Sequence, residues 1–178
     1  MGNYFLYHYY EAENGPFKNL SALPYDEARK VMEKVKQEGT VFASRRSDDY
    51  LTVRRQLEER ARTLFIDKGG KPEKLYPHYM TLGRCEWLKS WYKEGRVLQI
   101  PLEEFDPETI SFTYGDLFPT MRYKDGKPYR EKIYLQDEIK ELIEQFGWPQ
   151  EWNRDGNKGP ERYIEVQIWD DKVVGKFL

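Results

Sequence analysis

Cysteine and histidine are scarce in the 178-residue sequence, which contains one cysteine and two histidines. The single cysteine, Cys85, excludes both an internal disulfide and a cysteine-rich metal cluster. His8 and His78 are far apart in the chain and lack the short spacing of zinc-binding histidine pairs. We therefore expect no metal site.

Long apolar runs and an excess of charge are also missing. No segment approaches the roughly 20 apolar residues of a membrane-spanning helix. The opening residues, MGNYFLYHYY, lack the basic region and apolar run of a signal peptide. The net charge is −2, which makes no general electrostatic case for nucleic acid. These absences predict a soluble cytoplasmic protein that does not enter a membrane.

Aromatic residues, by contrast, are abundant: they make up 16% of the chain, with 14 tyrosines and 5 tryptophans. Tyrosine and tryptophan combine a large apolar body with a polar tip. They are suited either to filling a core that is modest in aliphatic residues or to lining a groove.

The pattern of apolar residues predicts a single globular domain over residues 1–178. Alternating and aromatic-rich segments predict strands at 3–10, 78–82, 97–102, 109–114 and 162–169. Helical spacing predicts helices at 25–37, 49–66, 86–92 and 137–146. A short extended segment at 40–43 and a hairpin at Asp125-Gly126 are also expected. Because strands and helices do not alternate regularly, we expect an α+β fold with a mixed, mostly antiparallel sheet.

The two histidines and two carboxylates are candidates for chemistry. His8 and His78 lie in expected strands among aromatic residues, where histidine is more often a structural hydrogen-bonding residue than a catalyst. Glu165 occupies the middle of the last strand, on the face shared with Tyr163, Gln167 and Trp169. That face lies either in solvent or in a polar groove. Asp116 follows a strand directly, where it serves a site or caps a turn.

Six arginines fall within residues 45–62, and no lysine does. Guanidinium groups bind phosphates through two parallel hydrogen bonds, so the cluster is suited to a pyrophosphate or a nucleic-acid backbone. The helical members are also explained by a solvated helix face with i,i+4 pairs such as Glu58–Arg62. Arg45 and Arg46 precede the helix and are the stronger candidates for cofactor binding.

Read together, His8, Tyr79 and Glu165 resemble the His-Tyr-Glu arrangement of ADP-ribosyltransferases of the diphtheria-toxin and poly-ADP-ribose-polymerase type. The histidine lies in the first strand, the tyrosine in a strand that leads into a short helix, and the glutamate in a late strand. The segments YMTLG, CEWLKSWY and VLQIPL resemble that family's tyrosine strand, helix and next core strand. The opening LYHYY and the closing GPERYIEVQIW are similar to bacterial DNA-targeting members.

The resemblance implies NAD as cosubstrate and nucleic acid or protein as acceptor. It implies that His8 hydrogen-bonds the nicotinamide ribose, that Tyr79 stacks on the nicotinamide ring, and that Glu165 stabilises the positive charge developing on the sugar. Cofactor binding would involve Arg45 or Arg46 at the pyrophosphate, with His78 and Asp116 nearby. RNA 2′-phosphotransferases share this lineage, so their activity is a variant of the same interpretation.

Two other functions are compatible with the sequence. The chain is either a non-enzymatic module that binds nucleotide or nucleic acid through aromatic strands and arginines, or a structural or interaction protein whose aromatics fill the core. Its oligomeric state is open.

Overall fold

The computed structural model describes residues 2–38 and 49–178. The strands are β1 (Phe5–Glu11), β2 (His78–Leu82), β3 (Gly95–Pro101), β4 (Ile110–Tyr114) and β5 (Ile164–Ile168). The α-helices in the described residues are α1 (Tyr25–Glu38), α2 (Tyr50–Asp67), α3 (Glu86–Lys89), α4 (Leu117–Arg122), α5 (Gln136–Phe146) and α6 (Pro149–Trp152).

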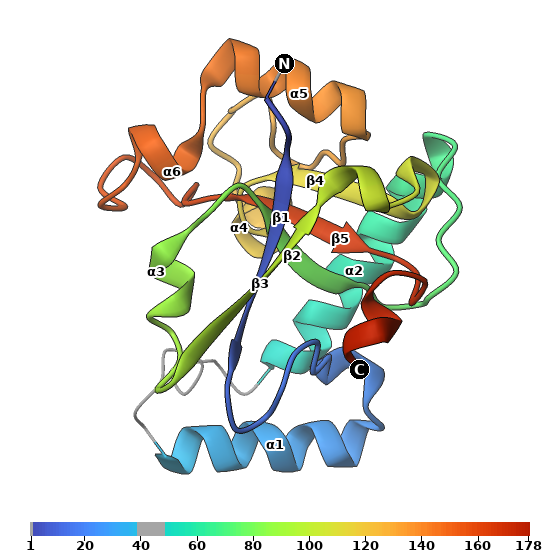
Figure 1. Cartoon of the computed structure of the whole chain (residues 1–178), viewed down its shortest axis with the longest axis vertical. Coiled ribbons are helices and arrows are strands. Elements are labelled where there is room, and N and C mark those ends of the chain that lie inside the picture. The colour runs from blue at the N-terminus through green and yellow to red at the C-terminus, as the bar shows by residue number, and fades with distance from the viewer. Residues whose placement is uncertain (1, 39–48) are drawn as a thin grey trace.

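The five strands form one sheet in the order β3-β1-β2-β5-β4. Every neighbouring pair of strands is antiparallel. The expected α+β class with a mostly antiparallel sheet is therefore confirmed. Strands distant in the sequence are neighbours at the centre, where β2 pairs with β5. The strands cross the middle of the molecule, with α5 at the top and α1 at the bottom (Figure 1).

The sheet has an apolar face and a polar face. Residues directly opposite each other on paired antiparallel strands point to the same side, and side chains alternate along each strand. The apolar face carries fully buried aliphatic and aromatic residues, including Ile164, Val166, Ile168, Phe112 and Leu82. The polar face carries Glu165 and Gln167 together with their opposite neighbours Thr81, Thr113, Tyr79 and Ser111.

Different helices cover the two faces. Helix α5 packs Ile139 and Ile143 on the apolar face. Helices α2 and α4 pack against Trp169, which follows β5 and alternates to the polar side. At the other end of the polar side, the segment containing α3 packs Cys85 and Trp87 around Tyr9 and Tyr163. The middle of the polar face thus lies between helices α2 and α4 at one end and the α3 segment at the other.

Two expectations about local structure were wrong, and one helix was not expected. The Asp125-Gly126 turn is present, but within residues 123–134 the structure has no flanking strands, apart from a single bridge between Tyr134 and Phe112. The Glu131 N–H instead donates to the Thr120 carbonyl of α4 at 2.8 Å, a helix that the sequence pattern did not predict. The expected helix at 86–92 ends at Lys89. The extended segment expected at 40–43 lies outside the described residues.

No helix among the described residues is long and apolar enough to cross a membrane.

Candidate functional site

Glu165 occupies the centre of the polar face. It lies opposite Thr81 of β2 and Thr113 of β4, and its side chain is almost enclosed, with 6% of the residue exposed. Its Oε1 accepts a hydrogen bond from Gln167 Nε2 at 3.1 Å, and its Oε2 lies 3.5 Å from the Tyr163 hydroxyl. A carboxylate at mid-strand is thus oriented by its own strand rather than by solvent.

A hydrogen-bonded chain across β4 and β5 holds Gln167 in position. Its Oε1 accepts from Ser111 Oγ at 2.8 Å, and its Nε2 also donates to Thr113 Oγ1 at 3.1 Å. Ser111 Oγ in turn accepts from Trp169 Nε1 at 2.9 Å. Because these groups are buried and paired, Gln167 has little freedom to move away from Glu165.

Asp116 is the second carboxylate of the site. It caps α4 by accepting from the Phe118 N–H at 2.8 Å, and its Oδ2 accepts from the Tyr163 hydroxyl at 3.0 Å. The Tyr163 hydroxyl therefore lies between Asp116 and Glu165. Burial, followed by the charge of Asp116, raises the pKa of Glu165 well above its usual value. This environment therefore favours the neutral form of Glu165 in the free protein.

Arg54 of α2 lies at the same site, so the alternative of a solvated helix face does not hold for this arginine. It is 9% exposed, and its Nε donates to Glu58 Oε1 at 2.8 Å. Glu58 is fully buried and also accepts from Ser21 Oγ at 2.5 Å. The Arg54 guanidinium carbon lies 5.3 Å from the centre of the Tyr79 ring, and its charge acts against the rise in the Glu165 pKa. Arg54, Tyr79 and Glu165 are therefore neighbours.

Sequence reasoning missed the pairing of Arg54 with Glu58, although the two residues have the i,i+4 spacing of a helical ion pair. The sequence pattern instead predicted an ion pair between Glu58 and Arg62. Arg62 binds the carbonyl oxygens of Lys74 and Pro72 at 2.9 and 3.1 Å. The i,i+4 spacing alone does not indicate whether Arg54 or Arg62 pairs with Glu58 in the protein interior.

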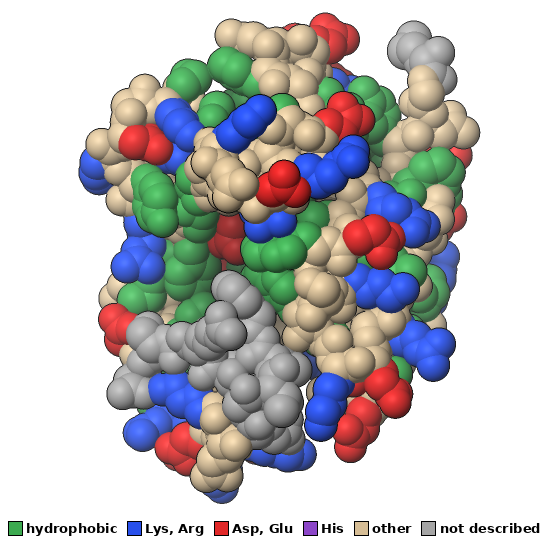
Figure 2. Space-filling view, turned by 90° about the vertical axis from the view of Figure 1, so that its left-hand side faces the viewer, with side chains coloured by type: hydrophobic (Ala, Val, Ile, Leu, Met, Phe, Trp, Pro, Cys, Tyr) green, Lys and Arg blue, Asp and Glu red, His purple; other side chains and the backbone are tan. Residues whose placement is uncertain are grey.

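The described surface has a hollow in which acidic atoms lie between hydrophobic side chains (Figure 2). Burial raises the pKa values of Tyr79 and Tyr163 well above that of free tyrosine, so both hydroxyls remain protonated donors. The site thus combines two carboxylates, two neutral phenols and one guanidinium.

The structure does not bring His8 to this group. Tyr7 is opposite Thr81, so Tyr7 shares the polar face and the next residue, His8, points to the apolar face. His8 Nδ1 lies 2.8 Å from the Tyr79 carbonyl oxygen, and the Phe17 N–H donates to His8 Nε2 at 2.8 Å. The ring also stacks on Phe17, with 3.9 Å between ring centres. Of the three expected catalytic residues, Tyr79 and Glu165 share a face and His8 does not.

His78 also lies on the apolar face, opposite Ile168. Its Nε2 lies 2.7 Å from Asp171 Oδ1, away from Glu165. Of the four residues expected to bind cofactor, Asp116 lies at the site, His78 does not, and Arg45 and Arg46 are outside the described residues. Within the described residues, no group of three or more His, Cys, Asp or Glu is placed to hold a metal ion.

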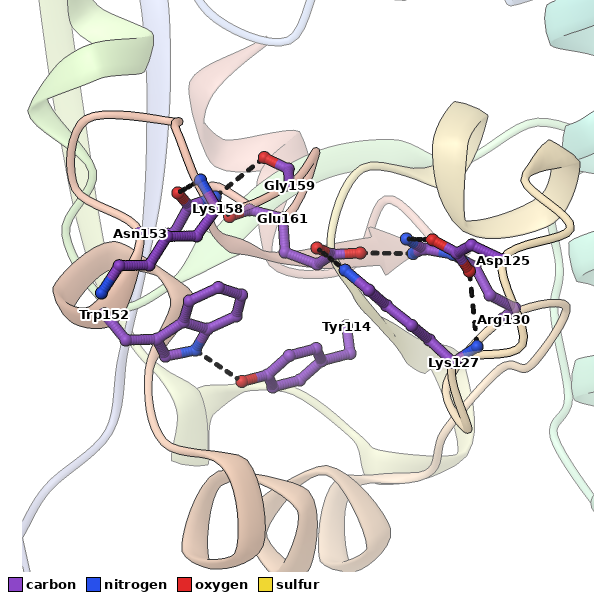
Figure 3. A network of polar contacts seen from close by, with 9 residues as sticks. All are labelled: Tyr114, Asp125, Lys127, Arg130, Trp152, Asn153, Lys158, Gly159 and Glu161. Carbon is purple, nitrogen blue, oxygen red and sulfur yellow. Dashed lines mark hydrogen bonds and ion pairs between the residues drawn. The ribbon is translucent and has the colours of Figure 1, made fainter.

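A buried ion cluster fixes the segments that lead into the site (Figure 3). Glu161 is fully buried and pairs with Arg130 and with Lys127, whose Nζ lies 3.1 Å from Glu161 Oε2. Arg130 also donates twice to Asp125, at 2.9 and 2.8 Å. The cluster joins segment 123–130 to the residues just before Tyr163.

Gly115 allows this cluster to approach Asp116. Its φ of +110° is a conformation that side-chain-bearing residues rarely adopt. A Cβ at this position would lie 3.3 Å from Glu161 Cγ and 3.4 Å from Thr120 Oγ1. The turn from β4 into Asp116 therefore packs directly on the Glu161 side chain.

Acidification is expected to destabilise the protein through His8. Burial lowers the pKa of His8 to about 4, and the Phe17 N–H needs the unprotonated Nε2 as its acceptor. Unfolding restores a pKa of about 6.5, so the unfolded chain binds more protons between these values. Stability is present above pH ~6.5, and up to roughly 3 kcal/mol is lost as the pH falls to ~4.

Urea unfolding at a series of pH values measures this loss in the wild type and in His8→Gln. The difference in unfolding free energy between the two proteins should change across this pH window. His78→Gln is measured in parallel, because burial lowers the His78 pKa as well and adds a pH dependence of the same sign that has to be separated from that of His8. A difference that is constant with pH would contradict the assignment to His8.

Comparison of the chain with protein-family models, curated proteins and solved structures found no match. The function of the chain is therefore inferred from its own residues and geometry.

Proposed function

We propose that the chain is an NAD-consuming transferase of the ADP-ribosyltransferase type, with nucleic acid or protein as acceptor. The observation that carries this proposal is the placement of Glu165. It is held by Gln167 and Tyr163 on the same sheet face as Tyr79, which lies in the adjacent strand.

A nearly enclosed carboxylate suits the chemistry of this transfer. Breaking the bond between nicotinamide and ribose places positive charge on the sugar, and a fixed carboxylate in a low-dielectric site stabilises that charge strongly. The nicotinamide ring of NAD is itself a cation, so its binding beside Glu165 favours the ionised carboxylate and offsets the raised pKa. In this proposal NAD contacts Glu165 at the 6% of the residue that is exposed.

Tyr79 and Arg54 supply complementary groups. In this proposal the Tyr79 ring stacks on nicotinamide, and the guanidinium of Arg54, oriented by Glu58, binds a phosphate of the cosubstrate. His8 supports the site from the other face, where it binds the backbone carbonyl of Tyr79. This role replaces the direct contact with ribose that the sequence resemblance implies for His8.

A thermal-shift measurement with NAD tests the proposal. At ten times its dissociation constant, a ligand that binds only the native state adds about 1.4 kcal/mol, which raises Tm by about 3 to 5 °C for a chain of this size. The rise should disappear in Tyr79→Ala and persist in the matched control Tyr123→Ala, a half-exposed tyrosine on segment 123–134. Equal rises in Tm for both variants would show that Tyr79 does not contact NAD. If NAD does not raise the Tm of the wild type, NAD binding is contradicted.

A second candidate function, nucleic-acid binding, is favoured by a groove at another part of the surface. Two hollows of about 340 and 500 Å³ share Gly83 and Trp148 and are therefore adjacent, and together they are called the groove here. Its lining includes aromatic residues and arginines, namely Tyr4, Phe5, Tyr7, Trp87, Trp148, Arg84, Arg154 and Arg162. Aromatic faces and guanidinium groups are the usual partners of bases and phosphates in single-stranded nucleic acid.

Binding at this groove should depend weakly on salt. Glu86 and Glu151 line it as well and offset part of the charge of the three arginines. Each neutralised phosphate of a single strand contributes about −0.7 to the slope of log K against log salt, so we expect a slope of about −2 or shallower.

Fluorescence anisotropy of a labelled single-stranded oligonucleotide measures this slope. Loss of one stacking residue, in Trp148→Ala, should weaken binding by roughly 10-fold to 100-fold. Tyr123→Ala, which lies outside the groove, should bind like the wild type. Equal affinity of Trp148→Ala and the wild type would exclude the groove as the binding surface.

A further inference from the structure

The two carboxylates of the site share one hydroxyl but have different surroundings. The Tyr163 hydroxyl lies 3.0 Å from Asp116 Oδ2 and 3.5 Å from Glu165 Oε2. Glu165 is nearly enclosed between β2 and β4, whereas Asp116 is half-buried at the start of α4. When two neighbouring carboxyl groups differ in this way, one is favoured as the neutral acid and the other as the anion.

Within the described residues, the groups named here around this pair lie in or beside four elements. Arg54 of α2 and Tyr79 of β2 interact with Glu165, and the Leu117 N–H at the start of α4 acts to lower the Glu165 pKa. Gln167 and Tyr163, in and beside β5, complete the surroundings of Glu165. Asp116 instead accepts from the Phe118 N–H at 2.8 Å, a fixed donor that favours the anion.

We infer that Asp116 is the general base of the transfer and takes the proton of the acceptor, while Glu165 stabilises the ribose. This inference rests on the proposed function and adds a catalytic role for a residue that the resemblance places only near the cofactor. Asp116 fits the role because the residue is half-buried and so is more accessible to an acceptor from solvent than Glu165, which is 6% exposed.

The bond between ribose C1′ and the nicotinamide nitrogen breaks, and its electron pair leaves with nicotinamide, which becomes neutral. A lone pair of the acceptor oxygen or nitrogen forms the new bond to C1′. The acceptor's proton passes to the Asp116 carboxylate, and Glu165 faces the positive charge that develops on the ribose.

A nucleophile that carries no proton distinguishes the role of Asp116 from the role of Glu165. Nicotinamide release from NAD is measured first with water as the acceptor and then with added azide, which needs no base. Asp116→Asn should release nicotinamide about 100-fold more slowly than the wild type with water. Azide should restore its rate to near the wild-type value. Glu165→Gln should be slow with both nucleophiles, because azide does not replace the stabilisation of the ribose.

Asparagine is chosen because it caps a helix about as well as aspartate, so α4 should keep its start. The Tm of each variant checks this. An Asp116→Asn variant that keeps the wild-type rate with water, or that azide does not rescue, would overturn the role of Asp116 while leaving the proposed function standing. A wild-type protein that binds no NAD and releases no nicotinamide would overturn the proposed function itself, and the base role with it.

Discussion

Replacing Glu165 with glutamine is expected to lower the rate of nicotinamide release from NAD by about 100-fold to 1000-fold. Glutamine keeps the size of the side chain and its acceptor oxygen, so the bond from Gln167 Nε2 to position 165 remains possible. The variant loses only the negative charge that stabilises the developing positive charge of the ribose. Single-turnover measurement of nicotinamide release checks the result.

The same substitution should stabilise the protein at high pH. Burial raises the folded-state pKa of Glu165, so the folded protein holds a proton that the unfolded chain releases near pH 4.3 to 4.5. The contribution of Glu165 to stability is therefore present below that pH and is lost as the pH rises through the folded pKa. The loss is about 1.4 kcal/mol for each pH unit that separates the folded pKa from the unfolded one. Glu165→Gln removes this dependence.

Glu144→Gln is the matched control for both measurements. Glu144 is exposed on α5, which covers the opposite face of the sheet. It should keep the wild-type rate and the wild-type dependence of stability on pH. Unfolding of Glu165→Gln at neutral pH would show instead that the carboxylate is needed for the fold and would count against a catalytic role.

Replacing Arg130 with methionine is expected to lower the free energy of unfolding by about 3 kcal/mol, which lowers Tm by about 6 to 12 °C. Arg130 pairs with Glu161, which is fully buried, and removing one partner leaves a buried charge with less compensation. Lys127 remains as a partner of Glu161 and limits the loss. Thermal and urea unfolding measure the change.

Two further variants distinguish the contribution of the buried Arg130–Glu161 pair to stability from a general effect of removing charge. Lys124→Met removes an exposed cation of the same segment, 72% of whose side chain is exposed, and should melt close to the wild type. The double variant Arg130→Met/Glu161→Gln should be less destabilised than the sum of its single variants, because it leaves no buried charge behind. Simple additivity would show that the pair contributes through packing alone.

The periodicity of the sequence was sufficient to predict the main elements. The strand 78–82 and the helices near 25–37 and 137–146 follow from local patterns of apolar residues, and they agree with β2, α1 and α5 to within a residue or two. The alternation from Tyr163 to Trp169 also separated an aliphatic face of β5 from a mixed face, and the aliphatic face lies in the core. These features depend on neighbours in the sequence, so the sequence reports them directly.

The hairpin at Asp125-Gly126 shows where local patterns fail. Its turn is local and was predicted, and Arg130 binds Asp125 within the segment, but two other partners are distant. Glu131 pairs with α4, and Arg130 pairs with Glu161 beyond α5 and α6. No spacing within the segment indicates these distant partners.

By itself, the sequence determined the fold class and most strands and helices, and it indicated Glu165, Tyr79 and Asp116 as candidate site residues. The tertiary structure alone decided which of the candidates meet. Because β2 pairs with β5, Tyr79 and Glu165 share a face, while the register of β1 turns His8 to the other side. It also turned Arg54 inward, toward Glu58 and Tyr79. Strand register and helix rotation result from the packing of the whole chain, and a one-residue difference in either moves a side chain to another surface.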